Sequence, residues 1–395
     1  MHKYEEALKI LRDIPLNLKT VRVAVNKVFN RVLAEDLYTD FPFPDCRKSA
    51  VDGYALVMWD KKEYTIKGES VPGDLKSAEL HEGECIFVMT GGIVPDNADA
   101  VVRVEDVFEE NDHILVNRQP EKGSNINLAG EEFLQNAFFG GKGSLLDNLS
   151  YPALCYSGKK DVNVYKKPKI GVFVTGDEIL EPGDDYKKGH VFNTNRYILQ
   201  SLLNYLPADI EYVGCFDDNE EEIAKVLEKS NEYDILVSSG GVSMGKYDFV
   251  KKILHEYDYE IIINKTAIKP GSPLMVARNE DCTIFGMPGY PAAFATNLIL
   301  YLLPFVRKSC GIKIFENNII KGKLGTSMRS RINALYFNRA VVKIEDGEPV
   351  AYDPGSQKTS HFLNFFNANG LVMLDENVGS LEKGSIVNIV PVRGL

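Results

Sequence analysis

The spacing of the apolar residues changes three times along the chain. Residues 4–12 (YEEALKILR) place apolar side chains at helical spacing with two glutamates in the first turn, which predicts a helix. Residues 21–41 continue a mixed helical pattern that ends at a Phe-Pro turn. From residue 49 to about 137, short β-prone runs alternate with Gly, Pro, Asp and Asn turns, and this pattern predicts an all-β lobe.

Strand-like and helix-like segments alternate between residues 165 and 310. The predicted strands are residues 170–174, 211–216, 235–238, 259–263 and 282–285, and the predicted helices are residues 193–206, 217–230, 247–255 and 291–308. Continuous apolar strands that alternate with amphipathic helices are typical of a doubly wound parallel sheet with helices on both faces.

Helical spacing is absent beyond about residue 316, where residues 340–344, 371–374 and 385–392 read as strands. We therefore expect a multidomain α/β plus β protein with a β-rich N-terminal lobe, a doubly wound parallel α/β domain and a small C-terminal β-barrel. The expected boundaries are 1–164 for the N-terminal region, with its lobe at about 42–137, then 165–315 for the α/β domain and 316–395 for the barrel.

Composition and charge argue against several classes of protein. The net charge of −11, without a basic stripe, argues against a nucleic-acid partner. The longest apolar stretch, residues 298–306, is about half the length that crosses a bilayer, so no membrane span is expected. The first 20 residues alternate charge and apolarity, unlike a signal peptide, and the six scattered cysteines suit free thiols, so we expect a cytoplasmic protein.

Polar or glycine-rich loops follow four of the predicted strands. They are residues 175–178 (TGDE), 217–218 (DD), 238–248 (SSGGVSMGKYD) and 286–291 (GMPGYP). Ligands of open α/β sheets bind beyond the carboxyl ends of the strands, so these loops are expected to meet at one crevice. Glycines and helix N-termini there suit a phosphate group.

Three carboxylates in these loops are candidate ligands of Mg²⁺, which takes carboxylates together with substrate phosphate oxygens. They are Glu178, Asp217 and Asp248. The alternative interpretation of Asp217 is a helix N-cap, and that of Asp248 is an acid in the first turn of a helix.

Residues 265–273 (KTAIKPGSP) are the best candidate for binding an oxyanion. On an extended chain Lys265 and Lys269 would share one face, and two such like charges favour an anion between them. The alternative is a pair of solvated lysines on a strand edge.

Residues 49–55 and 89–95 are, by themselves, ordinary turns. The chain contains no P-loop, and no G-x-G-x-x-G follows the first strand of the α/β domain, which argues against a P-loop nucleotidase and a dinucleotide-binding enzyme.

The order of these motifs resembles the molybdopterin molybdenumtransferase family (the bacterial MoeA type, similar to the E domain of gephyrin). The matching segments span the whole chain: SAVDGYA, MTGGIVP, GDEI, FNTNR, SSGGVSMGKYD, AIKPGSP, GMPGYPAA, FNR and PGSQ. The resemblance implies an elongated homodimer of four-domain subunits, in which the first helix packs with the α/β domain.

The resemblance also implies which residues act. The catalytic set is Asp52, Thr90, Glu178, Asp217 and Asp248, and Glu132 joins Glu178, Asp217 and Asp248 as a ligand of Mg²⁺. The substrate-binding set is Lys265, Lys269, Pro270, Ser239, Gly240, Gly241, Ser243, Pro288, Pro291, Arg339 and Ser356. This chain departs from the family pattern at residues 127–129 (NLA), at Ser272 and at Tyr290.

The reaction implied is the insertion of molybdate into adenylylated molybdopterin with Mg²⁺ as cofactor, releasing AMP. Other molybdenum cofactor enzymes are further expected partners. One alternative is the adenylyltransferase of the preceding step, which shares the α/β domain but needs only about 150 residues and typically has a G-G-T-G loop. The other alternative is a non-catalytic, gephyrin-like scaffold.

Overall fold

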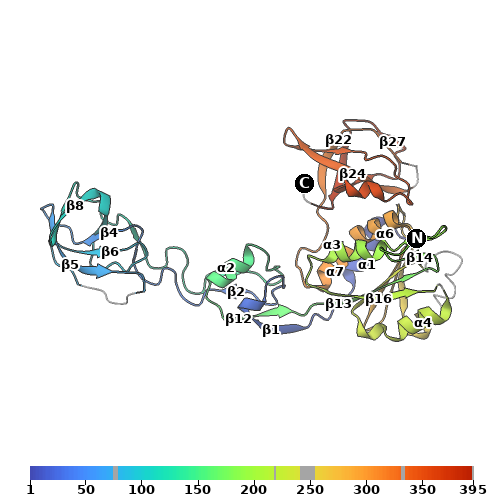
Figure 1. Cartoon of the computed structure of the whole chain (residues 1–395), viewed down its shortest axis with the longest axis horizontal. Helices are drawn as coiled ribbons and strands as arrows, with labels where there is room; N and C mark the ends of the chain where they lie inside the picture. Colours follow the sequence, from blue (N-terminus) through green and yellow to red (C-terminus); the bar gives the residue numbers. More distant parts are fainter. Residues whose placement is uncertain (74–78, 218, 241–253, 331–333, 394–395) are drawn as a thin grey trace. The chain divides into compact units, whose positions relative to one another are not determined.

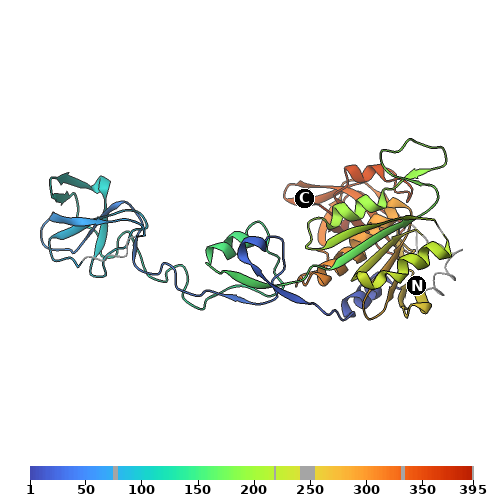
Figure 2. The ribbon, with the colours of Figure 1, turned by 60° about the horizontal axis from the view of Figure 1, so that its bottom comes forward.

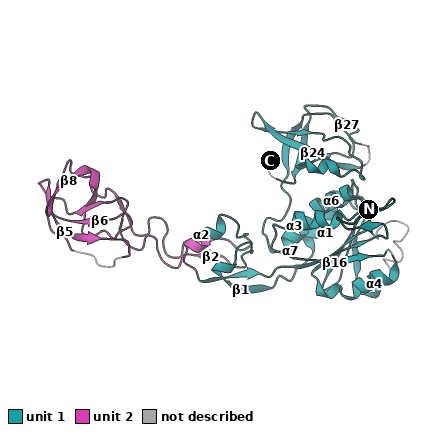
Figure 3. Ribbon diagram, in the orientation of Figure 1, with its two compact units in different colours: residues 1–35, 142–152, 160–395 teal, residues 36–141, 153–159 magenta. Residues whose placement is uncertain are grey.

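The computed structural model describes residues 1–73, 79–217, 219–240, 254–330 and 334–393. The chain forms two compact units (Figures 1 and 3). Unit 1 contains residues 1–35, 142–152 and 160–395, and unit 2 contains residues 36–141 and 153–159. Because unit 2 is inserted into unit 1, the segments that open and close the N-terminal region belong to the same body as the α/β domain.

A six-stranded sheet forms the centre of unit 1, with the order β16-β13-β17-β21-β20-β18. Its strands are β13 (Lys169–Thr175), β16 (Asp209–Phe216), β17 (Ile235–Ser239), β18 (Glu260–Asn264), β20 (Met275–Arg278) and β21 (Thr283–Met287). The parallel sheet is confirmed for β16, β13, β17 and β21. β20 and β18 extend it in antiparallel pairing, because a short turn joins β20 directly to β21 and leaves no room for a crossover.

Helices cover both faces of this sheet (Figure 2). On β13, Ile170 and Val172 pack toward α3 (Asn195–Leu203), whereas Phe173 packs toward α4 (Glu220–Glu228) on the opposite face. Successive side chains of a strand point to opposite faces, so a strand buried on both sides must be apolar at every position. This explains the continuous apolar runs in the sequence.

The predicted first helix is α1 (Tyr4–Asp13). Its residues Tyr4, Ala7 and Leu11 are buried at helical spacing in the same cluster as the α/β core. The ring of Tyr4 meets the rings of Tyr301 and Phe337 edge-on, with centroids 5.8 and 5.2 Å apart. One aromatic side chain therefore joins the first helix, the α/β domain and the C-terminal domain.

Two expectations about helices need correction. Residues 21–41 are not helical, because β1 (Thr20–Ala24) pairs antiparallel with β12 (Asp161–Tyr165), and a 3-10 turn and β2 (Leu37–Tyr38) follow. The sequence TVRVA alternates with period two, which is the pattern of a strand. The helix expected from Asp217 begins at Glu220 instead, and its N-cap is Asn219, whose side chain accepts the Glu222 N–H at 3.0 Å.

The helix predicted at residues 291–308 is continuous but not uniform. It consists of α6 (Pro291–Asn297), a π-helical segment (Leu298–Leu302) and α7 (Leu303–Ser309), with Pro291 at N1 as expected. The helix predicted near residues 247–255 lies mostly outside the described residues. None of the helices in the described ranges is long and apolar enough to cross a membrane.

The C-terminal strands close into a five-stranded barrel, as expected. They are β22 (Ile320–Leu324), β24 (Leu335–Glu345), β25 (Glu348–Tyr352), β26 (Gly370–Leu374) and β28 (Ile386–Pro391). β24 pairs with both β25 and β26, and β22 links β25 to β28, so the ring has no open edge.

The predicted all-β lobe is the main part of unit 2. Its sheet has the order β7-β4-β6-β5-β9-β8. The strands are β4 (Gly53–Leu56), β5 (Glu63–Ser70), β6 (Glu84–Val88), β7 (Ala100–Arg103), β8 (Val107–Glu110) and β9 (His113–Val116). Separate apolar clusters, around Ile86 and around Tyr64, fill its two faces. A further short pairing joins β2 to β11 (Phe138–Gly140) within the same unit.

Candidate functional site

A cleft of about 900 Å³ opens in unit 1 at the carboxyl ends of β13, β17 and β21. Three of the four predicted loops contribute to it. Five of the predicted site residues line the cleft, namely Glu178, Ser239, Gly240, Pro288 and Pro291. Its apolar walls include Phe192 and Tyr290, which sequence reasoning did not assign, together with Phe362 from the C-terminal domain.

Gly240 is required at the floor of this cleft. Its φ is +96°, and an added Cβ would lie 2.8 Å from both the carbonyl oxygen and the hydroxyl of Thr175. Its N–H donates to the carbonyl of Met287 at 3.1 Å. The glycine therefore permits a close approach between two strand ends, and its N–H, which we expected to face a phosphate, is already used by the fold.

Asn195 joins two of the loops that line the cleft. Its Nδ2 donates to the Ser239 hydroxyl at 2.6 Å and to the Gly289 carbonyl at 2.8 Å. Its Oδ1 and the Thr175 hydroxyl are buried and lack a hydrogen-bond partner among the described residues. Buried polar atoms are normally paired, so an ordered water beneath the cleft floor would satisfy these two atoms. Asn195 belongs to the FNTNR motif of the sequence, but only the fold shows that it connects these two loops.

Glu178 and Asp217 occupy one acidic neighbourhood beyond β13 and β16. Burial first, and then the carboxylates of Glu181, Asp217, Glu178 and Asp177, raise the pKa of the nearby Cys215 thiol. Mg²⁺ needs only one or two protein carboxylates when substrate phosphates complete its coordination, and of these two acids Glu178 lines the cleft.

The other two predicted metal ligands are Asp248 and Glu132. Asp248 lies outside the described residues, as do Gly241 and Ser243 of the same loop. Glu132 belongs to unit 2, where its carboxylate accepts the Tyr156 hydroxyl at 2.8 Å. Within the described ranges, no three His, Cys, Asp or Glu side chains form a group that could hold a metal ion by themselves.

The segment of residues 265–273 is not a continuous strand. Lys265 has a φ of +64°, which breaks the extended chain between β18 and the short β19 (Ile268–Lys269). The expectation that Lys265 and Lys269 share one strand face is therefore wrong. Lys269 is exposed, its Nζ lies 5.9 Å from the centre of the Tyr336 ring, and β19 pairs with the start of β24. Pro270 follows directly, and Pro273 lines the cleft.

Arg339 does not have the geometry of a direct oxyanion ligand. It is only 2% exposed, and its guanidinium donates to the carbonyls of His361 (2.6 Å), Ser356 (2.8 Å) and Lys358 (3.2 Å) and to Oε1 of Gln357 (3.3 Å). Burial lowers its pKa. We therefore correct the assignment: Arg339 holds the 356–361 loop, whose Ser360 lines the cleft, while Ser356 is exposed at the start of that loop.

Asp52 and Thr90 form a pair in unit 2. The backbone N–H of Thr90 donates to Oδ1 of Asp52 at 2.7 Å and its hydroxyl donates to the same oxygen at 2.9 Å. These two hydrogen bonds, the backbone one first, lower the pKa of Asp52. The two motifs that looked like ordinary turns are thus connected through one ionised carboxylate.

A cleft at the carboxyl ends of a doubly wound sheet, walled partly by a closed β-barrel, defines a multidomain α/β ligand-binding protein. Family models cover nearly all of the chain. Residues 2–158 match the MoeA N-terminal region (domains I and II), residues 171–308 a probable molybdopterin binding domain, and residues 321–392 the MoeA C-terminal region (domain IV). The chain belongs to the MoeA family.

Similar proteins align along the full chain. A molybdopterin molybdenumtransferase from Haemophilus influenzae is 29% identical over 98% of this chain and 97% of its own length. One from Staphylococcus aureus is 28% identical over 98% and 94%. The crystal structure of the molybdopterin biosynthesis MoeA protein from Pyrococcus horikosii superposes with a TM-score of 0.83 at 27% identity, covering 100% of this chain and 99% of that one.

Proposed function

We propose that this protein is a molybdopterin molybdenumtransferase that inserts molybdate into adenylylated molybdopterin and releases AMP, with Mg²⁺ as cofactor. The observation that carries the proposal is the cleft of about 900 Å³, which lies on the domain that matches the molybdopterin-binding family model. Relatives that bear the transferase name match this chain from end to end, rather than over the α/β domain alone.

The cleft offers separate surfaces for the parts of such a substrate. Phe192 and Tyr290 supply flat apolar walls for a ring system, and the polar residues Asn195 and Thr175 contribute to the floor. Glu178 lies at the cleft edge, where a carboxylate can share a cation with a phosphate group. When bound there, Mg²⁺ would polarise the phosphoanhydride.

Both alternatives account for less of the chain. An adenylyltransferase would use the α/β domain but would leave the barrel, which contributes Ser360 and Phe362 to the cleft wall, without a purpose. A scaffold would not need a cleft of about 900 Å³ at the strand ends. We further propose that the protein is a homodimer, which light scattering coupled to size-exclusion chromatography would test against the 44.1 kDa monomer mass.

The reaction itself is tested by following AMP release from adenylylated molybdopterin with and without molybdate. A molybdenumtransferase should release AMP in response to molybdate, whereas an adenylyltransferase would not and a scaffold would release none. The Glu178→Gln variant should lose turnover by orders of magnitude at limiting Mg²⁺ because it keeps the size of the side chain and removes its charge. Glu221→Gln is the matched control, since Glu221 is 81% exposed and pairs with Lys225 on α4. Unchanged turnover in Glu178→Gln would remove Glu178 from the metal site.

A further inference from the structure

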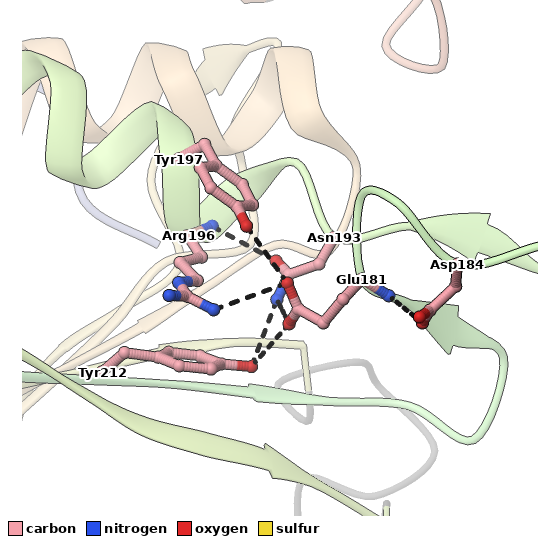
Figure 4. Close-up of polar contacts among 6 residues, drawn as sticks. All are labelled: Glu181, Asp184, Asn193, Arg196, Tyr197 and Tyr212. Carbon is pink, nitrogen blue, oxygen red and sulfur yellow. Dashed lines mark hydrogen bonds and ion pairs between the residues drawn. The ribbon is translucent and has the colours of Figure 1, made fainter.

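A polar cluster centred on Glu181 (Figure 4) includes Asn193, which also lines the cleft. Oε1 of Glu181 accepts the Asn193 amide at 2.7 Å and the Tyr212 hydroxyl at 3.0 Å. Oε2 accepts the Tyr197 hydroxyl at 3.3 Å and lies 3.4 Å from Nη1 of Arg196. Four donors therefore meet at one carboxylate: two from α3, one from β16 and one from Asn193, two residues before α3 begins.

The members of this cluster also hold one another. The Arg196 guanidinium lies over the Tyr212 ring at 3.9 Å from its centre. Asn193 is 2% exposed, and its amide also donates to the Tyr212 hydroxyl at 3.2 Å. The Arg196 and Glu181 side chains are 25% and 37% exposed, so the network is partly buried, and its paired polar groups fix a local geometry. The cluster is therefore a built feature rather than a chance surface ion pair.

Glu181 directly follows the segment that carries Glu178. That segment is held by β14 (Ile179–Leu180), which pairs with β15 (Val191–Phe192) over only two residues. The carbonyl of Glu178 accepts the Val191 N–H at 2.9 Å, and the carbonyl of Leu180 accepts the Asn193 N–H at 2.7 Å. A two-residue pairing is weak by itself, so its alignment depends on contacts at its ends.

We propose that Glu181 is a positioning residue of the cleft. Its carboxylate fixes the β14–β15 pair and, through that pair, the place of the Glu178 side chain. Glu181 reaches no cleft surface of its own and acts on the reaction through Glu178. This inference rests on the proposed function only for the part that Glu178 plays in catalysis.

The first test measures hydrogen–deuterium exchange of the free protein by mass spectrometry. In Glu181→Gln the amide oxygen can still accept two donors, but the NH₂ group now faces the other two. We expect the amides of residues 191–193 to exchange about tenfold faster. Tyr212→Phe removes one donor and keeps the ring under Arg196, so we expect a smaller acceleration. Glu211→Gln on the same strand, which breaks an exposed ion pair with Lys169, should leave these amides unchanged.

The second test separates positioning from general destabilisation. Misplacement of Glu178 should raise the Mg²⁺ concentration for half-maximal AMP release by about tenfold, with the rate recovering at saturating Mg²⁺. A loss of folded protein would lower the maximal rate and leave the half-saturating concentration in place. Glu181→Gln with wild-type exchange at residues 191–193, or with faster exchange and an unmoved Mg²⁺ dependence, would overturn the proposal. The exchange result needs neither metal nor substrate, so it stands even if the proposed reaction is wrong.

Discussion

Replacing Arg339 by lysine distinguishes a loop clamp from an oxyanion ligand. The guanidinium reaches four acceptors along residues 356–361, and a planar group with five donors suits such a spread of acceptors. Lysine keeps the positive charge but concentrates its donors at one point. If Arg339 bound molybdate through its charge, the lysine would keep part of that function. If Arg339 instead holds the loop through its spread of donors, the lysine would not hold it.

The expected cost follows from the lost contacts. A hydrogen bond to a charged group contributes about 1.5–3 kcal/mol, and a lysine ammonium can keep about two of the four. Water can replace part of the loss at the exposed carbonyls of the loop, so we expect local destabilisation of about 2–4 kcal/mol. At 1.4 kcal/mol for each factor of ten, this corresponds to about 30- to 700-fold faster opening of the loop.

Hydrogen–deuterium exchange of residues 356–363 measures this opening directly. Arg393→Lys is the control, because Arg393 is an exposed arginine that makes one bond to the Phe366 carbonyl outside this segment. In molybdate titrations, Arg339→Lys should lower the maximal rate without moving the half-saturating molybdate concentration. Wild-type exchange in the loop, combined with a raised molybdate requirement, would refute the clamp and restore Arg339 as a ligand.

Three further outcomes test other parts of the structure. Thr90→Val removes the hydroxyl that favours ionised Asp52 but keeps the stronger backbone bond, so the depressed pKa of Asp52 should rise part of the way toward its usual value. A carboxyl group with a depressed pKa stabilises the fold at pH values above its unfolded-state pKa of about 3.9, and this stabilisation is lost as the pH falls through the native pKa. The variant should therefore retain less of it. An NMR titration in which the pKa of Asp52 is unchanged in the variant would contradict this expectation. Gly240→Ala should destabilise unit 1 by about 1–3 kcal/mol in urea because its Cβ would lie 2.8 Å from a backbone oxygen, whereas Gly289→Ala, whose nearest atom is 4.0 Å away, should be near neutral; equal effects would argue against the close approach. Lys269→Ala should leave the thermal midpoint nearly unchanged and raise the half-saturating molybdate concentration by about 10- to 140-fold, as expected for one charge-assisted contact, and a normal molybdate response would exclude Lys269 from the oxyanion site.

Elements with a single dominant pattern were predictable from sequence. The strand expected at residues 170–174 is β13, and that at 235–238 is β17, because strands buried on both faces are apolar without interruption. The β1–β12 ribbon was missed because the alternation in TVRVA covers five residues within a longer stretch of mixed character. β20 was missed because its four residues carry no more periodicity than a turn.

The candidate site was predictable where it depends on position along a strand. Loops after parallel strands meet at one edge of the sheet, and Glu178 and Ser239 therefore lie in the cleft. Roles that depend on burial were not predictable. An arginine that binds an anion and one that binds four loop acceptors look alike in sequence, and only its 2% exposure separates them for Arg339. Likewise, Lys265 differs from an extended residue only in its φ.

The packing of α1 has a consequence for the order in which the protein can be built on the ribosome. Tyr4 is made among the first residues, yet its partners Tyr301 and Phe337 are made about 300 residues later. At about 5–20 residues per second, the apolar face of α1 waits roughly 15–60 s for Tyr301. Unit 2, by contrast, is complete once residue 159 has been added. The inserted unit can therefore fold while the helix that precedes it remains unpaired and available to chaperones, and the body that carries the cleft closes last.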